Sequence, residues 1–397
     1  MISSAISYTK AEHVDDISSR LWDIVIIGAG PAGAMAAYEL AQHALDVLLI
    51  DQSEFPRRKV CGGCLSRRAL DLLEQAQLGD LPWRLGAKAL HALRLTSGGR
   101  TAKIPIPGGC SLSRETFDFA LIQEARKKGA VFLPKTKGLL QNPSNDFARI
   151  QVFQSGKKSE IRTRIVIVSD GLQGNALRDI QKSGVEISAN ALLGLSACAD
   201  IKNFPSGQGV IDMFCAHGGY VGVTRREDDR LEIAAAVRPG FLKSLKTPEH
   251  CVSSLMKEAG CAWSGNFPES AWRGTFALSR SRRVLAGTRF FALGDTAGFV
   301  EPFTGEGIYW ALLQAKTLTT LLKSTNFQWN TLLEKQWPRE HQRILTARQR
   351  TCGLIAALLR VPAYCHFAVG ALRHAPWLAA PLIRYIHGGT NLRTHTP

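Results

Sequence analysis

Three glycines at fixed spacing, followed by an acidic residue, form the first pattern in the chain that could do chemistry. In the run Gly-Ala-Gly-Pro-Ala-Gly, Gly28 permits a tight turn, Gly30 lets a diphosphate approach the backbone, and Gly33 lets a helix pack on a strand. The helix N-terminus would bind the phosphates, and Asp51 would accept hydrogen bonds from an adenosine ribose. We therefore predict a dinucleotide site. Its residues are Gly28, Gly30, Pro31, Ala32, Gly33, Asp51 and Gln52.

A strand, a helix and a second strand must hold this site. Residues 23–27 form a continuous apolar run, as expected for a strand buried on both faces. Good helix formers fill residues 34–41, and the apolar residues 47–50 lead into Asp51. This β–α–β order predicts a parallel sheet.

A second candidate site is the basic, glycine-containing loop at residues 56–64. Cys61 and Cys64 have the spacing of a redox dithiol, but packing alone is the simpler interpretation, above all for Cys64. Zinc is disfavoured because no second Cys-x-x-Cys or close histidine pair accompanies them, so we expect no metal site. Two adjacent glycines, Gly62 and Gly63, would let the backbone approach a flat ring without a Cβ in the way.

The order strand, glycine-containing loop, helix returns at residues 291–308. This segment resembles the second flavin motif of the glutathione-reductase-type flavoproteins, in the p-hydroxybenzoate-hydroxylase superfamily. The resemblance implies FAD, with Asp295 holding the ribityl chain and the following loop meeting the pyrimidine edge of the flavin. A helix N-terminus there would stabilise the negative charge of reduced flavin. The residues matched to this motif are Gly294, Asp295, Pro302, Gly305, Glu306, Gly307 and Ile308.

Further residues match the same superfamily. Asp170-Gly171 follows an apolar strand, as the superfamily's middle motif does, although Arg178 comes one residue late. Arg114, at the start of a helix expected from about 113 to 128, resembles the arginine that the superfamily directs at the FAD diphosphate. Lys59 belongs to a basic cluster that could neutralise FAD phosphates or an anionic substrate head. That cluster is Arg57, Arg58, Lys59, Arg67 and Arg68.

The loop after the second strand points to one branch of the superfamily. Cys61-Gly62-Gly63 resembles the Cys-Gly-Gly loop of the geranylgeranyl-reductase-like flavoproteins, which lies beside the flavin ring. The resemblance implies hydride transfer between flavin N5 and a carbon–carbon bond of a lipophilic, prenyl or polyketide-like substrate. Cys61 would then be a proton donor or gate near the ring. Tyr220, in a predicted hairpin at 219–237, and His217, just before it, could act as acid–base groups.

Two other functions stay open. One is hydroxylation of an aromatic substrate with oxygen and NAD(P)H as a transient reductant, because hydroxylases share these FAD motifs. The other is a redox sensor built on flavin and the Cys61 and Cys64 thiols. Halogenation is disfavoured because the Trp-x-Trp-x-Ile-Pro signature of flavin halogenases does not occur. The electron donor cannot be chosen from the sequence.

The composition is that of a globular protein with a basic surface. The 397 residues are 45% hydrophobic and carry a formal charge of +16, which suits an anionic cofactor or lipid. We expect no nucleic-acid partner, because no known binding motif accompanies the charge. The nine cysteines and the polar residues 1–20 predict reduced thiols in the cytoplasm.

We expect an α/β fold with a Rossmann-like, parallel-sheet FAD-binding domain, an antiparallel substrate domain and a C-terminal helical region. The expected FAD-binding domain comprises residues 21–90, 110–185 and 284–325. The substrate domain comprises 91–109 and 186–283, and the helical region 326–397. After His341 the chain has no Asp or Glu, so residues 341–397 predict either peripheral contact with the inner face of a membrane or a cap on the substrate domain.

Overall fold

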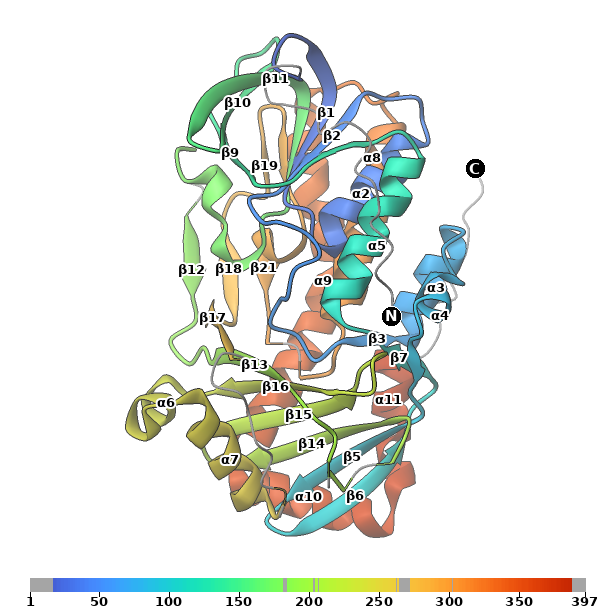
Figure 1. The fold of residues 1–397 in the computed structure, drawn as a ribbon, viewed down its shortest axis with the longest axis vertical. Helices are drawn as coiled ribbons and strands as arrows, with labels where there is room; N and C mark the ends of the chain where they lie inside the picture. Colours follow the sequence, from blue (N-terminus) through green and yellow to red (C-terminus); the bar gives the residue numbers. More distant parts are fainter. Residues whose placement is uncertain are drawn as a thin grey trace.

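The structure is a computed structural model that describes residues 17–180, 184–202, 204–205, 207–261, 263, 272–301 and 303–387. Within these residues the fold has two large sheets, one above the other in Figure 1, and helices that link and cover them. The expected α/β class with a parallel-rich sheet, antiparallel strands and C-terminal helices is confirmed.

The upper sheet carries the glycine motifs. Its central path, β19–β20–β11–β1–β2–β8, is parallel except at β19, and β10 and β9 extend it antiparallel from β11. The strands are β1 (Leu21–Ile27), β2 (Val47–Ile50), β8 (Val131–Leu133), β9 (Thr136–Leu140), β10 (Ala148–Gln154), β11 (Lys157–Val168), β19 (Ala286–Gly287) and β20 (Phe290–Ala292). The predicted strand at 165–168 is the buried end of the longer β11.

Alternation along β1 explains how this sheet is buried on both sides. Ile24 and Ile26 pack against the helices α2 (Pro31–Ala41), α5 (Arg114–Lys127) and α8 (Gly307–Lys323). Val25 and Ile27 join a second cluster on the opposite face, with side chains of β9, β10 and β11. Because both faces are covered, the strand contains no polar residue after Asp23.

The lower sheet has the order β17–β13–β16–β15–β14–β5–β6 and is antiparallel except for the β5–β14 pair. Its strands are β5 (Ala92–Ser97), β6 (Arg100–Pro105), β13 (Leu193–Ala199), β14 (Val210–Ala216), β15 (Gly219–Arg225), β16 (Leu231–Val237) and β17 (Arg273–Ala277). Phe214, Val221 and Val223 face α7 (Pro248–Ala259), while Met213 and Cys215 face the other side. The helix α6 (Pro239–Leu245) lies next to α7 (Figure 1).

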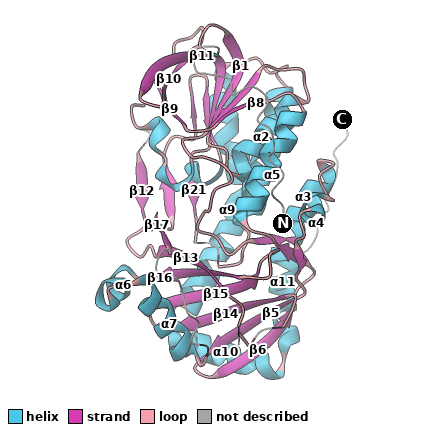
Figure 2. Cartoon of the chain, viewed as in Figure 1, coloured by secondary structure: helices cyan, strands magenta, loops and turns pink. Residues whose placement is uncertain are grey.

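Smaller elements connect the two sheets (Figure 2). One small sheet is formed by β3 (Cys64–Ser66), β7 (Gly109–Ser111) and β4 (Lys88–Ala89), and another by β12 (Val185–Ile187), β18 (Arg280–Arg282) and β21 (Gly298–Phe299). The helical pieces are α3 (Arg67–Gln75), α4 (Leu81–Arg84), η1 (Gly171–Gln173), η2 (Asn175–Leu177) and η4 (Gly294–Thr296).

The C-terminal helices run from the upper part of the molecule to the far face of the lower sheet. They are α9 (Thr331–Leu359), α10 (Pro362–His374), η5 (Pro376–Ala379) and α11 (Ala380–His387). Trp337 anchors α9 by donating its indole N–H to the Ala292 carbonyl at 3.0 Å. Cys365 and Val369 anchor α10 on the lower sheet. Among the described helices, none alone is long and apolar enough to cross a bilayer.

Candidate flavin site and substrate cavity

The first glycine motif makes an open anion site at the start of α2. Gly28 has a φ of +107°, and a Cβ there would lie 2.3 Å from the Ser169 carbonyl oxygen. A Cβ on Gly33 would lie 1.9 Å from the Gly28 oxygen, so both positions require glycine. Gly30 caps α2 without any side-chain hydrogen bond and no acid lies in the first turn. The N–H groups of this first turn therefore have no side-chain cap, and the positive end of the helix dipole favours an anion beside them.

Two arginines stand over Gly30. The place where its Cβ would be lies 3.7 Å from Nη2 of Arg57 and 3.8 Å from Nη2 of Arg114. Asp118, fully buried, holds Arg114 by two hydrogen bonds of 2.7 Å and lies 3.5 Å from Nη1 of Arg57. That Nη1 atom is buried without a hydrogen-bond partner among the described residues. Arg57 Nη2 also lies 3.9 Å from Asp51, so two carboxylates balance the two guanidinium groups. The guanidinium N–H groups that stand over Gly30 are the kind of donor that fits the diphosphate of FAD.

Asp51 lies where a ribose acceptor is needed. It is 8% exposed at the end of β2, and each carboxylate oxygen accepts one backbone N–H at 2.8 Å, from Ala29 and from Ser53. Each oxygen keeps a further lone pair for a hydroxyl group. Asp51 and Gln52 line the same cavity as Gly30, Pro31 and Ala32.

The second glycine motif folds against the first. Gly294, with a φ of +63°, comes so close to α2 that a Cβ on it would lie 2.9 Å from the Ala32 Cβ. Asp295 faces the cavity; burial raises the pKa of its carboxyl, although Lys59 and Arg114 nearby oppose that shift. Burial, with Arg57 and Arg114, lowers the pKa of the Lys59 ammonium in the same cavity.

The start of α8 completes this side of the cavity. Gly305, Gly307 and Ile308 line it. Glu306 does not: it is 2% exposed and lies 3.8 Å from Arg348 on α9. The Glu306 side chain therefore points away from the cavity, so among these motif residues the lining comes from Gly305, Gly307 and Ile308. Pro302 lies outside the described residues.

The middle motif is held by a different arginine from the one that its sequence suggested. The Asp170 carboxylate accepts hydrogen bonds from the Ala176 N–H at 2.8 Å and the Thr296 hydroxyl at 3.0 Å. Arg282, 7% exposed, donates to the Thr296 carbonyl at 2.7 Å, whereas Arg178 is half-exposed beside Asp179. Asp170 and Gly171 both line the cavity.

The Cys-Gly-Gly loop lies between the two sheets. The Gly62 carbonyl accepts the Thr224 hydroxyl of β15 at 2.9 Å, and the missing Cβ of Gly62 would stand 3.8 Å from that of Ala234 on β16. Gly63 has a φ of +65°, and its carbonyl accepts the Leu112 N–H. The loop thus contacts the lower sheet through the backbone of Gly62.

Both thiols of this loop are protonated at neutral pH. Burial raises the pKa of Cys61, although Arg114 and the Gly63 N–H favour its thiolate. Burial also raises the pKa of Cys64. Thiolate is the form that exchanges with disulfides, so burial disfavours thiol exchange at both sulfurs. The described residues contain no cluster of side chains that could hold a metal ion.

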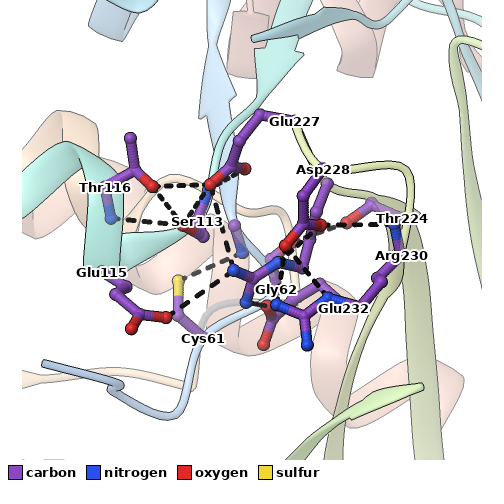
Figure 3. A network of polar contacts seen from close by, with 12 residues as sticks. Cys61, Gly62, Ser113, Glu115, Thr116, Thr224, Glu227, Asp228, Arg230 and Glu232 are labelled. Carbon is purple, nitrogen blue, oxygen red and sulfur yellow. Dashed lines mark hydrogen bonds and ion pairs between the residues drawn. The ribbon is translucent and has the colours of Figure 1, made fainter. Parts of the chain in front are cut away.

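A polar network fixes the lower sheet against α5 (Figure 3). Glu227, in the turn between β15 and β16, accepts the Ser113 N–H at 3.0 Å and the Ser113 and Thr116 hydroxyls at 2.6 Å. Arg226 pairs with Glu232 at 3.1 Å and with Asp228 at 3.2 Å. Because Ser113 caps the helix that begins at Arg114, the turn of the lower sheet sets the position of Arg114 over Gly30.

Beyond the flavin residues, the cavity of about 940 Å³ has an apolar half. One wall comes from β5, β6 and β14 and the other from the C-terminal helices. The side chains that form it include Leu93, Leu95, Ile104, Ile211, Met213, Ile355, Leu359, Leu372 and Ile383.

The two proposed acid–base residues of the hairpin have different positions. Tyr220 lines the cavity, and its ring meets the edge of Phe303 at a centroid distance of 4.9 Å. Burial raises the pKa of the Tyr220 hydroxyl, which therefore stays protonated. His217 is exposed at the β14–β15 turn and does not line the cavity. Its backbone N–H donates to the Glu258 carboxylate on α7. A role for His217 above the flavin does not fit this position.

Sequence reasoning missed several residues of the site. Asp118 is recognisable in retrospect, since an acid four positions after Arg114 on a helix lies on the same face. Arg57 was one of five clustered cations, and nothing in their order singled it out. Arg282 and the apolar residues of α9 to α11 come from distant segments, so only the fold brings them to the cavity.

Comparison with known proteins agrees with this geometry. A family model described as "FAD binding domain" matches residues 22–326. The chain is 30% identical over 305 residues to digeranylgeranylglycerophospholipid reductase 2 of Methanosphaera stadtmanae, covering 73% of this chain and 75% of that protein. It is 26% identical over 359 residues to menaquinone reductase of Mycobacterium tuberculosis, with 80% and 81% covered. A geranylgeranyl bacteriochlorophyll reductase-like protein from Thermoplasma acidophilum superposes with a TM-score of 0.77 over 92% of this chain and 94% of that one, at 16% identity.

Proposed function

The chain belongs to this FAD-binding family, as an FAD-dependent oxidoreductase of the geranylgeranyl-reductase-like type, and we propose that it transfers hydride between flavin N5 and a carbon–carbon bond of a prenyl-chain lipid. The observation that carries this proposal is the single cavity with Asp295, Cys61 and Gly62 at one part and the apolar walls of β5, β14 and α9–α11 at another. A long hydrocarbon chain matches such walls, since burying it removes apolar surface from water. The two relatives are named for reduction of lipids of this kind.

When bound, reduced FAD supplies the hydride. The double bond gains one hydride on one carbon and one proton on the other, so the reaction needs a proton donor in the cavity. The cavity is lined by Tyr220, Cys61 and Cys64, and burial raises the pKa of each, which keeps all three protonated. Tyr220 contacts Phe303, two positions before Gly305 of the flavin motif, which favours its hydroxyl as the donor.

The remaining residues bind and orient. We propose that Arg57, Arg114 and the start of α2 hold the diphosphate, Asp51 the ribose, and Asp295 the ribityl chain, with Lys59 adding positive charge. In this proposal residues 21–90, 110–185 and 284–325 form the flavin unit, and 91–109 and 186–283 the substrate unit. Residues 326–397 supply the outer wall of the substrate cavity. We also propose that the protein works at the inner, cytoplasmic face of a membrane, where such lipids reside. All nine of its cysteines lie in the described part and form no disulfide, as expected for a reducing compartment.

The test is reduction of prenyl acceptors by the pre-reduced holoprotein without oxygen, which avoids any assumption about the electron donor. We expect flavin reoxidation together with a product that has gained two hydrogens per reduced double bond. Met213→Trp, which fills the apolar half, should lower turnover of long chains more than of short ones. Leu332→Trp, at an exposed position, is the matched control. Incorporation of labelled oxygen into an aromatic compound, without prenyl reduction, would instead establish a hydroxylase.

A further inference from the structure

The end of α9 and the elements after it expose large apolar side chains to an unusual degree. We call this set the C-terminal apolar surface. Its members are Leu354, Leu358, Val361, Tyr364, Phe367, Trp377, Leu378, Leu382 and Tyr385. Phe367 is 77% and Trp377 71% exposed, although α10 is firmly packed on the sheet through Cys365 and Val369. Clustered exposure of this kind marks an interaction site.

The C-terminal apolar surface also surrounds an opening of the cavity. Leu358, Tyr364, Phe367 and Leu382 are exposed to solvent and at the same time line the cavity. They come from α9, α10 and α11, the red helices along the side of the lower sheet away from α6 and α7 (Figure 1). The apolar half of the cavity therefore opens in the middle of an apolar surface.

Charge identifies the occupant of this surface. No Asp or Glu follows Glu340, and Arg350, Arg373 and Arg384 are exposed within the same segment. Arg350 precedes Leu354 and Leu358 by one and two helical turns, so all three lie on one face of α9. Anionic lipid headgroups meet such arginines favourably, whereas a symmetric contact between two copies would bring like charges together.

Taken together, α9 and α10 are long and apolar enough for a broken span or a re-entrant segment, but the bend between them suits helices that lie on a bilayer surface. The axes of α9 and α10 meet at 100°, so the pair is bent at the cavity mouth. Trp377, Tyr364 and Tyr385 are the residue types that prefer the headgroup level of a membrane. Short helices with aromatic and aliphatic side chains on one face and arginines beside them lie in the interface.

We propose that the C-terminal apolar surface docks on an anionic lipid bilayer and that the cavity opens into it, so that a lipid reaches the flavin without crossing water. The docking stands independently, whereas the route of the lipid rests on the proposed prenyl reduction. Leu354 and Trp377 do not line the cavity, so docking and substrate binding can be separated by mutation.

The test is flotation of the full-length holoprotein with phosphatidylcholine vesicles, with and without phosphatidylglycerol, at low salt. We expect binding to the anionic vesicles that weakens as salt screens the charges. Leu354→Ser/Trp377→Ser should weaken binding at least about ten-fold. Arg373→Gln/Arg384→Gln should weaken it roughly five-fold per arginine, from about 1 kcal/mol each. The matched control is Trp83→Ser/Leu332→Ser, which removes exposed apolar side chains elsewhere and should bind like the wild type.

Three results would each overturn the docking proposal. The first is wild-type protein that does not bind anionic vesicles at low salt. The second is a Leu354→Ser/Trp377→Ser variant that binds as well as the wild type. The third is a dimer that this double variant converts to a monomer, which would make the surface a contact between copies. Turnover of a short, water-soluble prenyl acceptor should be the same in the double variant and the wild type. If no acceptor is reduced but vesicles are bound, the proposed function fails and the docking proposal does not.

Discussion

Arg114 donates two parallel hydrogen bonds to Asp118, from Nε to Oδ1 and from Nη2 to Oδ2, each 2.7 Å long. Asp118 is fully buried one helical turn later on α5, so the guanidinium group cannot rotate away. Ser113, the preceding residue, is in turn held by Glu227 of the lower sheet. The position of the arginine over Gly30 is therefore set by both halves of the molecule.

Arg114→Lys should weaken FAD binding about 10- to 100-fold. A lysine cannot reproduce the pair of hydrogen bonds with which Asp118 holds the guanidinium group in place, and a hydrogen bond to a charged group contributes about 1.5–3 kcal/mol. Titration of the apoprotein with FAD, followed by flavin fluorescence, measures this. Lys127→Ala, at an exposed position on the same helix, should leave the affinity unchanged. Equal affinities for wild type and Arg114→Lys would mean that the diphosphate binds elsewhere.

Two glycines of the first motif should separate folding from cofactor binding. Gly33→Ala would drive its Cβ to 1.9 Å from the Gly28 oxygen and should destabilise the fold itself. The new Cβ of Gly30→Ala would have no atom closer than 3.7 Å, so the apoprotein should fold normally. It should lose FAD, because the added methyl group occupies the path of the diphosphate. Thermal unfolding of the apoprotein and FAD titration distinguish the two. A Gly30→Ala protein that binds FAD like the wild type would contradict the site.

Glu227→Gln should destabilise the protein by about 1–3 kcal/mol near neutral pH, because three partly buried donors lose a charged acceptor. Burial opposes the charge on Glu227, but hydrogen bonds from Ser113 and Thr116 outweigh it, and its pKa lies below the ordinary 4.5. A lowered carboxyl pKa stabilises the fold above 4.5, and that contribution is lost as the pH falls below it. The difference between variant and wild type in urea unfolding should thus shrink in acid. Glu54→Gln, on an exposed pair, should show no such difference.

His341 should make the wild type sensitive to mild acid. It is 8% exposed on α9, beside Trp337, and burial lowers the pKa of its imidazole to about 4 from 6.5. Between these values the unfolded chain takes up a proton that the folded chain refuses, so stability falls as the pH drops through this window. By this linkage the loss from about pH 7 to about pH 5 is about 2 kcal/mol. His341→Leu should abolish that part of the loss in urea unfolding, and an unchanged pH dependence would show that His341 titrates normally.

Local patterns were sufficient for the elements around the cofactor. The apolar runs at 23–27 and 47–50 and the helix expected from about 113 to 128 all correspond to elements of the structure. Each depends on neighbours within a few residues, such as a capping hydroxyl or a glycine turn. Pro362 and Pro376 likewise begin new helical pieces, whereas Pro338 lies inside α9, where it lacks the N–H that would bond to the carbonyl of Glu334.

The rest of the site depended on contacts between distant segments. Arg282 replaces Arg178 beside the Asp170 loop because β18 crosses it, which no local pattern reports. Glu306 belongs to a motif whose backbone faces the cavity while its side chain turns to Arg348. The two alternatives for residues 341–397 turned out to be compatible in the structure, since α10 caps the lower sheet with one face and leaves another exposed. Whether that exposed face meets a membrane stays a prediction.

The two hairpin residues first considered as acid–base groups give the sharpest test of the catalytic proposal. Tyr220→Phe keeps the ring against Phe303 and removes only the hydroxyl, so FAD affinity and folding should be retained. If that hydroxyl gives the proton, turnover of a prenyl acceptor should fall by about 10²–10⁴-fold, the usual contribution of a general acid. His217→Ala, at the exposed turn, should leave turnover unchanged. Equal turnover in Tyr220→Phe and wild type would move the proton donor to Cys61, and Cys61→Ser would then show the loss, measured as flavin reoxidation in a stopped-flow experiment without oxygen.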